Sequence, residues 1–361
     1  MILVASVERY GASAACWMAS QGMESTYYSP DPEIVENVSR YNPQLYHFLS
    51  RERFIELLSS GLLRYSSSPP QEADAILVCG DTLRSPPSSV RNVENLVMRL
   101  SVLRKPEVII FNILGRPGTS SRLLELLLHN MTGLTDGISH GYAGLIHRHS
   151  SLHPAYASDE RAENLISKMT SGKTVALSSM EEAEAATITL LAIESATMAV
   201  HHQASRILGV QPPSIIRVET GWENESVLKL FADLETVHGK LLTHVRNYLG
   251  RLFMESCRAV GKRVREGFRS GRSAVNILCV SEEMETAQWV ASYLPPRGCK
   301  LHTRDPVQVY EMVEVRGRLD LNYELVIVDG RLGRLAGLLR QRLGDDQVVI
   351  LEGVIPSSKG V

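Results

Sequence analysis

The sequence lacks the features that would place it in a membrane or hold it together through disulfides. No apolar run approaches the roughly eighteen residues of a membrane-spanning helix, and no segment has the pattern of a secretory signal. Five cysteines without paired spacing exclude a disulfide framework and a zinc ribbon. The formal net charge of −2 gives no overall attraction to nucleic acid or anionic lipid. We therefore expect a cytoplasmic globular protein with neither a membrane nor a nucleic acid as partner.

Apolar strands and amphipathic helices alternate over the first 150 or so residues. Strands are predicted over 1–6, 25–29, 73–81 and 106–114, and helices over 11–22, 29–41, 49–63, 88–103 and 120–131. Such alternation predicts a parallel sheet with helices on both faces.

The pattern changes near residue 179. Long helices are predicted over 181–208 and 223–260, followed by strands over 274–281, 298–306, 323–330 and 347–353 with helices over 285–294 and 334–343. The predicted fold is α/β, with two Rossmann-like domains, each with a parallel sheet, joined by a central long-helix region. We expect domains at 1–175, 176–272 and 273–361.

The stretch SVERYG follows the first strand and opens a small-residue helix, which is the place of a dinucleotide-binding turn. The three glycines of a G-x-G-x-x-G fingerprint fall on Ser6, Glu8 and Gly11, so only the third is present. Glu8 puts a negative charge where a diphosphate would lie. At about 4 Å and an effective dielectric of about 20, that repulsion costs about 4 kcal/mol, or roughly a thousandfold in affinity. Arg9 offsets part of it if its side chain turns inward.

Four histidines lie within SHGYAGLIHRHSSLH: His140, His147, His149 and His153. Imidazoles this close in sequence are able to bind zinc, copper or nickel. No carboxylate or cysteine ligand flanks them at a known spacing, so a polar loop is the simpler interpretation and we predict no metal.

The segment CRAVGKRVREGFRSGR carries six cations and one acid. Cations at the carboxyl end of a helix complement its dipole and solvate a linker. A contact with phosphate or RNA is the alternative.

Several stretches, taken in order, resemble the UDP-glucose/GDP-mannose 6-dehydrogenase family. They are residues 29–82, which contain SGLLR and ADAILVC, the ILGRPGTSSRLLELL turn and helix, the long helix over 178–210, and GCKLHTRDP. The resemblance implies an NAD-type first domain, a dimer through the central helices and a nucleotide-sugar-type third domain. It also implies oxidation of a nucleotide-sugar alcohol to a carboxylate in two hydride transfers to NAD, through a cysteine thioester.

The residues at the family's functional positions differ from those the chemistry needs. Leu114 stands at the position of the family's catalytic threonine. Thr187 and Leu191 stand at the positions of its lysine and asparagine, and His147 lies near the position of its loop carboxylate. Ser29 stands where an acid holds the adenosine ribose, while Asp31, two residues later, is expected to cap a helix. The family's cysteine loop has no counterpart in 210–231. Of the five thiols, Cys79 alone lies at the carboxyl end of a strand of the first sheet.

From these substitutions we predict a member of the family that is catalytically degenerate and acts as a scaffold or regulatory partner. It would be a homodimer, with an active paralogue as a further partner and no bound cofactor. An active NAD-dependent oxidoreductase on a UDP- or GDP-sugar is the alternative, and NAD is then its cofactor. A module that binds a small ligand in the cleft between its domains is the second alternative.

Overall fold

A computed structural model describes residues 1–361 except 43–44, 47, 84–85, 104–105, 132–136, 147–151, 209–226, 229, 231–236, 270, 272–273, 282–283, 316–322 and 353–361. The chain forms two compact units. Unit 1 comprises Met1–Tyr41 and Leu45–Ile193, and unit 2 comprises 42–44 and the chain from Glu194 onward. The predicted domain limits at 175 and 272 stay predictions. No helix in the described ranges is long and apolar enough to cross a membrane.

Unit 1 is built on an eight-stranded sheet with the order β3-β2-β1-β4-β5-β6-β7-β8. Its strands are β1 (Ile2–Ser6), β2 (Ser25–Tyr28), β3 (Leu63–Ser66), β4 (Ala75–Asp81), β5 (Val108–Leu114), β6 (Ser139–Ala143), β7 (His153–Ala157) and β8 (Thr174–Ala176). All neighbours are parallel except β6 and β7. The first six positions follow the strand order of a dinucleotide-binding sheet, so the predicted α/β class is confirmed.

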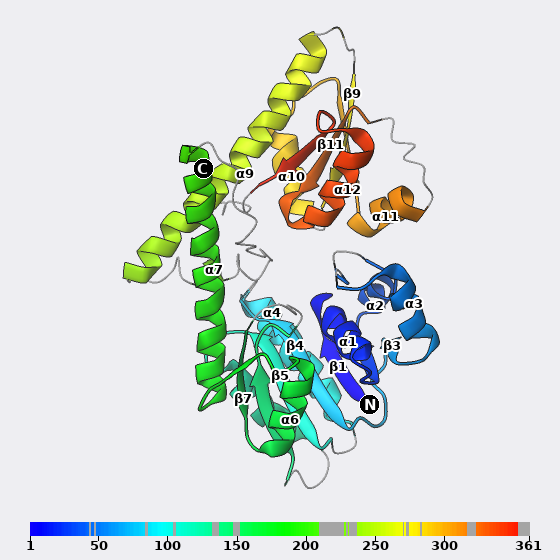
Figure 1. Ribbon diagram of the computed structural model, residues 1–361, viewed down its shortest axis with the longest axis vertical. Coiled ribbons are helices and arrows are strands. Elements are labelled where there is room, and N and C mark those ends of the chain that lie inside the picture. The colour runs from blue at the N-terminus through cyan, green and yellow to red at the C-terminus, as the bar shows by residue number, and fades with distance from the viewer. Residues whose placement is uncertain are drawn as a thin grey trace. The chain divides into compact units, whose positions relative to one another are not determined.

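The helices of unit 1 cover both faces of this sheet (Figure 1). They are α1 (Tyr10–Ser20), α2 (Pro32–Val38), α3 (Arg51–Ser59), α4 (Pro86–Leu100), α5 (Thr119–Asn130) and α6 (Glu160–Met169), with the start of α7 (Met180–Leu208). Asp31 caps α2 as expected, since its carboxylate accepts a hydrogen bond from the Glu33 amide at 2.9 Å. The predicted helix over 49–63 ends four residues early, because Gly61 turns with φ of 74° and Leu63 begins β3.

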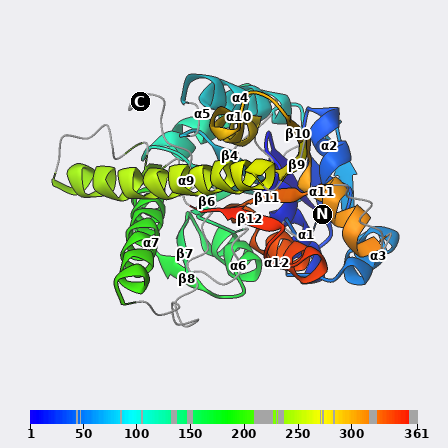
Figure 2. The same cartoon turned by 90° about the horizontal axis from the view of Figure 1, so that it is seen from above.

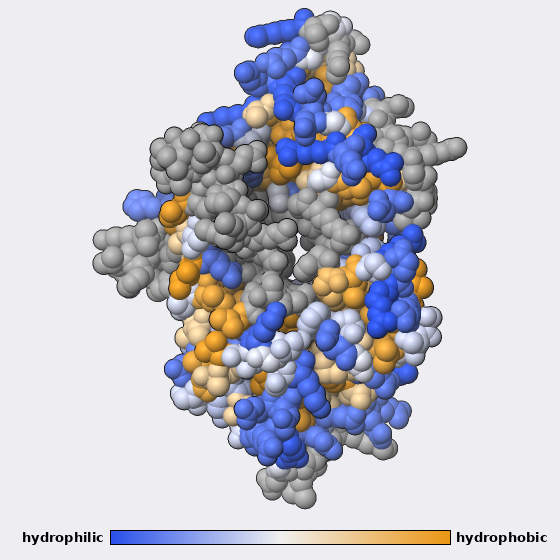
Figure 3. Space-filling view, viewed as in Figure 1, coloured by the Kyte–Doolittle hydropathy of each residue, from blue (hydrophilic) through white to orange (hydrophobic). Residues whose placement is uncertain are grey.

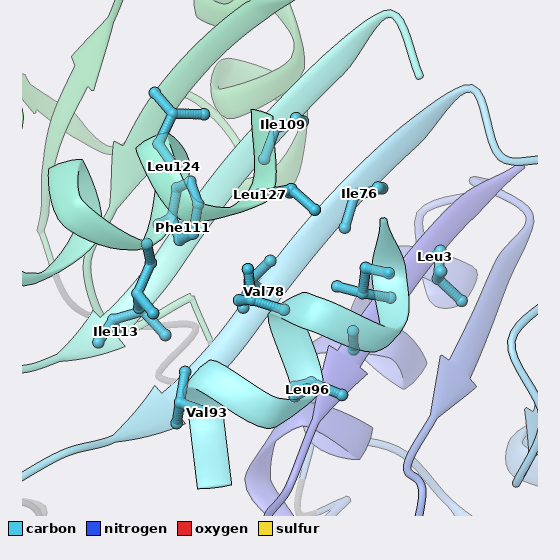
Figure 4. Close-up of a cluster of buried hydrophobic side chains, with 14 of the residues drawn as sticks. Leu3, Ile76, Val78, Val93, Leu96, Ile109, Phe111, Ile113, Leu124 and Leu127 are labelled. Atoms are coloured by element: carbon cyan, nitrogen blue, oxygen red, sulfur yellow. The ribbon is translucent and has the colours of Figure 1, made fainter. Parts of the chain in front are cut away.

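The main core of unit 1 lies between β4, β5 and the helices α4 and α5. Every residue of β4 and β5 is buried, which is why both strands are nearly continuous apolar runs. Figure 4 shows the side chains of this core, among them Ile76, Val78, Val93, Leu96, Ile109, Phe111, Leu124 and Leu127.

Unit 2 has a four-stranded parallel sheet with the order β10-β9-β11-β12. Its elements are α9 (Val237–Arg269), β9 (Val275–Val280), α10 (Met284–Tyr293), β10 (Cys299–Arg304), α11 (Pro306–Tyr310), a π-turn over Glu311–Val315, β11 (Leu325–Asp329), a 3₁₀ turn over Gly330–Leu332, α12 (Gly333–Leu343) and β12 (Val348–Leu351). The four predicted strands and two predicted helices are confirmed. Of the predicted long helix over 223–260, the part from Val237 onward is observed as α9, which continues to Arg269. Most of residues 223–236 lie outside the described residues.

Candidate functional site

In the sheet of unit 1 the strand order reverses between β1 and β4, because β2 and β3 follow on one side of β1 and β4 and β5 on the other. The carboxyl ends of β1 and β4 form the candidate site of this unit. Ser6, Cys79 and Asn112 lie in register across β1, β4 and β5. The chain enters α1 after β1 and α4 after β4. In open α/β sheets, ligands bind in the crevice at such a switch point.

Gly11 holds α1 against the sheet. A Cβ atom at this position would lie 2.5 Å from the Ser6 Cβ and 3.4 Å from the Cys79 Cβ. The first distance is far shorter than van der Waals contact, so only glycine allows this approach of α1 to β1. The one glycine of the fingerprint that the sequence keeps is therefore the one that packs helix on strand.

Side chains, rather than glycines, fix the turn between β1 and α1. The buried Ser6 hydroxyl accepts from the Glu8 amide at 3.0 Å and donates to the Glu8 carbonyl at 2.9 Å. The Tyr27 hydroxyl also donates to the Glu8 carbonyl, at 2.9 Å. The backbone at Glu8 is thus held by groups from β1 and β2.

The Glu8 carboxylate lies near enough to this edge of the sheet to change the ionisation of its neighbours. Burial raises the pKa of Cys79 to about 12, and the Glu8 charge adds to that rise. Burial likewise raises the pKa of Tyr27, where Glu8 adds to the rise and Arg9 opposes it. A diphosphate placed at the start of α1 would meet this negative charge, with Arg9 as a partial offset.

Ser29 is fully buried just after β2 and takes part in local structure. Its hydroxyl accepts from the Asp31 amide at 3.4 Å and hydrogen-bonds to the Tyr27 side chain, which lowers the pKa of that phenol. Ser29 therefore stabilises the end of β2, and it offers no carboxylate for a ribose.

Cys79 is fully buried, and its thiol accepts a hydrogen bond from the Asn112 side-chain amide at 3.8 Å. Because the thiolate is the nucleophile, the raised pKa makes Cys79 a poor one. Three other thiols, Cys16, Cys257 and Cys279, are also buried with raised pKa values.

We expect Cys79 to resist alkylation by iodoacetamide at pH 8 in the native protein. With a pKa of about 12, about one thiol in ten thousand is ionised, against roughly a quarter for an unperturbed cysteine. Peptide mapping by mass spectrometry should show Cys79 modified at least about a thousandfold more slowly than in the urea-unfolded protein. Comparable rates in the two states would contradict the burial of this thiol.

Leu114, Thr187 and Leu191 are buried within unit 1. The Thr187 hydroxyl donates to the Ala183 carbonyl at 2.8 Å and accepts from the Tyr142 hydroxyl at 3.2 Å. A Cβ on Gly144 would lie 2.2 Å from the Thr187 Oγ1, so α7 packs tightly on the chain just after β6. At these positions the protein has residues that pack in the core, instead of the lysine and asparagine that would stabilise an oxyanion.

Glu184 is a site residue that the sequence does not single out. The residue is 1% exposed, and its carboxylate accepts from the Gly118 amide at 2.7 Å, the Ser120 amide at 2.7 Å and the Ser120 hydroxyl at 2.5 Å. Burial raises its pKa, and these hydrogen bonds oppose the rise. The amino end of α5, a natural anion site, is thus filled by an acid of the same chain.

The histidines of the sequence cluster do not meet in the part of the chain that the structure describes. His140 pairs through its backbone with Ser158 near one end of the β6–β7 pair, and His153 lies near the other, where its Nδ1 is 2.9 Å from the Gly144 carbonyl oxygen. His147 and His149 lie outside the described residues. Within the described ranges, no three metal-ligating side chains come together.

The sheet of unit 2 has its own switch point between β9 and β11. Buried Asp329 ends β11, and its carboxylate accepts from the Ser281 hydroxyl at 3.2 Å and the Thr286 hydroxyl at 3.5 Å. Burial raises the pKa of nearby Cys279 to about 12, and the Asp329 charge adds to it. This edge carries an acid and two hydroxyls.

No protein-family model and no curated protein sequence matches the chain. Among solved structures it is similar to a UDP-glucose dehydrogenase from the hyperthermophilic archaeon Pyrobaculum islandicum, with a TM-score of 0.57 and 16% identity over 91% of this chain and 89% of that one. It is also similar to a UDP-D-ManNAc dehydrogenase from Pyrococcus horikoshii, with a TM-score of 0.54 and 14% identity over 91% and 88% of the chains. A third similar structure is a UDP-N-acetyl-mannosamine dehydrogenase from Staphylococcus aureus, with a TM-score of 0.52 and 11% identity over 91% of this chain and 87% of that one. The resemblance predicted from the sequence is confirmed at the level of the fold.

Proposed function

We propose that this protein has the nucleotide-sugar dehydrogenase fold without the dehydrogenase reaction, and that it acts in the cytoplasm as a scaffold or regulatory partner. The observation that carries the proposal is the turn between β1 and α1. There Ser6 and Tyr27 hold the backbone of Glu8, and a pyrophosphate bound at this turn in the manner of a dinucleotide would lie close to the Glu8 charge.

The other positions support the same proposal. Oxidation through a thioester needs an ionisable thiol beside the sugar, and the pKa of buried Cys79 is about 12. Stabilising an oxyanion needs donors aimed into the site, whereas Thr187 is engaged by Ala183 and Tyr142 and Leu191 is buried.

Turnover and co-purification test the proposal together. Purified protein, NAD and a panel of UDP- and GDP-sugars should give no NADH absorbance above a no-enzyme control. An active dehydrogenase of this fold from the same cell should co-purify with the tagged protein. Reduction of NAD with any of these sugars would overturn the proposal.

An active NAD-dependent oxidoreductase is the second candidate, because the complete strand order and the close packing at Gly11 are retained. Thermal melting separates the two. Ligand at a hundred times its dissociation constant adds about 2.7 kcal/mol to the free energy of unfolding, so a clear rise in melting temperature with NAD would favour the enzyme. A rise with a nucleotide-sugar alone would instead favour a small-ligand binding module.

We also propose that α7 pairs two copies of the chain. One stripe of α7 consists of Thr189, Ile193, Thr197 and Val200, all exposed, with Ile193 at 58% and Val200 at 66%. The stripe carries no charge, and residues spaced three or four apart lie on one helix face. A symmetric dimer would cover such a face on both copies.

Replacing Ile193 and Val200 by glutamate should weaken this dimer at least about a hundredfold, since it places unpaired charges in an apolar contact. Sedimentation velocity at several concentrations measures the change. Val102→Glu, at an equally exposed apolar position in unit 1, is the control. A protein that is monomeric without any substitution would refute the pairing.

A further inference from the structure

Five cations lie along one face of α9, and they are here called the basic stripe: Arg251, Arg258, Lys262, Arg265 and Arg269. All five are exposed, and their spacings of seven, four, three and four residues keep them on one side of a helix. At about 1.5 Å per residue the basic stripe is about 27 Å long. It runs along a single unbroken helix (Figure 1, Figure 2). On the face drawn in Figure 3, hydrophilic side chains gather at the upper end of unit 2, where α9 ends.

The opposite face of α9 fixes the direction of the basic stripe. Phe253, Cys257, Val260 and Val264 are buried in the core of unit 2, together with residues of β9 and α10. Because these residues hold α9 on the sheet of unit 2, the cations lie on the side of α9 that faces away from that sheet. They form a row on a folded helix, so binding a ligand along it requires no loss of backbone conformational entropy.

The basic stripe is only partly neutralised by the protein itself. Two exposed acids, Glu255 and Glu266, lie on the same side of α9, so this face keeps three of its five positive charges. Lys262 has Glu266 at 3.9 Å, an exposed pair of the kind that contributes under about 1 kcal/mol. Within the described part of the chain, the four arginines form no ion pair. The helix dipole does not account for them either, since its effect is confined to the last turn and Arg251, Arg258 and Lys262 precede that turn.

We propose that the basic stripe binds the phosphodiester backbone of a nucleic acid. Exposed cations gain affinity for a polyphosphate by releasing its condensed counterions, which requires charge in a row and no pocket. Four of the five are arginines, whose planar guanidinium groups bind phosphate oxygens in a fork. The net charge of −2 does not oppose this, because the binding depends on local charge.

Other occupants fit less well. A membrane-binding helix inserts an apolar face into the lipid, but the apolar face of α9 is in the core and no large hydrophobic side chain of its described part is exposed. A peptide ligand needs anchoring pockets, which a row of exposed cations does not provide. Pairing of two basic stripes from two copies of the chain would be unfavourable, because like charges would then face each other.

Fluorescence anisotropy with a labelled 20-base-pair DNA duplex tests this. Saturable binding is expected at 50 mM salt. If five phosphates are contacted, affinity should fall about 500-fold on going to 200 mM. The triple variant R258E/K262E/R265E should bind at least a hundredfold more weakly, with a shallower salt dependence. The variant R91E/R99E/K168E, which changes the net charge equally at exposed positions of unit 1, should stay within threefold of the unaltered protein.

Melting temperatures of both variants establish that they are folded, and a 20-nucleotide RNA, polyglutamate and phosphatidylserine vesicles serve as further probes. Binding of the RNA, the duplex or both, lost only in the variant of the basic stripe, supports the proposal and identifies the form preferred. Absence of saturable binding to either nucleic acid at 50 mM salt would overturn it. Equal losses in both variants, or binding to polyglutamate or vesicles alone, would overturn it too. None of these outcomes depends on NAD or on nucleotide-sugar turnover.

Discussion

Replacing Glu8 by glycine is expected to raise the affinity of the protein for NAD by up to about a thousandfold. The Glu8 charge lies at the start of α1, near Tyr27 and Cys79. Repulsion between that charge and one phosphate charge about 4 Å away costs about 4 kcal/mol at an effective dielectric of about 20. Glycine has no side chain, so it also lets a ligand come closer to the backbone at this position. Calorimetric titration of both proteins with NAD measures the gain.

Glu8→Gln separates charge from bulk. Glutamine keeps the size of the side chain and removes its charge, so it should recover the electrostatic part of the gain. The double variant S6G/E8G should bind no more weakly than E8G if the remainder of the turn is suited to a diphosphate. If neither E8G nor E8Q binds NAD better than the unaltered protein, the loss of the cofactor site does not lie at this turn.

Replacing Glu184 by alanine is expected to lower the free energy of unfolding by about 3–5 kcal/mol. The change removes the acceptor of two buried donors, the Ser120 amide and the Ser120 hydroxyl, and of the partly buried Gly118 amide. A buried donor left without a partner costs about 1–3 kcal/mol, and α5 also loses the negative charge at its amino end. Urea denaturation followed by circular dichroism measures the difference.

Glu181→Ala is the matched control, because Glu181 is exposed in the first turn of the same helix. It should change stability by no more than about 1 kcal/mol, since it loses only an exposed acid at the amino end of α7. Glu184→Gln retains an acceptor oxygen and should cost less than the alanine variant. An alanine variant as stable as the control would mean that the Glu184 hydrogen bonds do not hold α5.

The fold was predictable from the sequence where complete burial requires a continuous run of apolar residues. β4 and β5 are buried along their whole length, so their apolar runs identified them, and Asp31 marked the start of α2. β3 was missed because Leu63–Ser66 is a four-residue edge strand with one buried side chain. β6, β7 and β8 were missed as well, and the antiparallel pairing of β6 with β7 departs from the expected all-parallel sheet.

The candidate site was predictable only in part. The spacing of Ser6, Glu8 and Gly11 identified the turn after β1, and the contact of Gly11 with β1 agrees with the role of a third glycine. The contacts that fix the site join distant residues. Tyr27 lies 19 residues from Glu8, and Glu184 lies 66 residues from Gly118. No local periodicity encodes such pairs. An acid on the buried face of a helix was the available signal for Glu184.

Calorimetric titration of the unaltered protein with NAD at low salt tests the central claim most directly. If Glu8 prevents a diphosphate from binding at the turn between β1 and α1, no saturable binding should appear at NAD concentrations below about 1 mM. A dissociation constant in the micromolar range would contradict it.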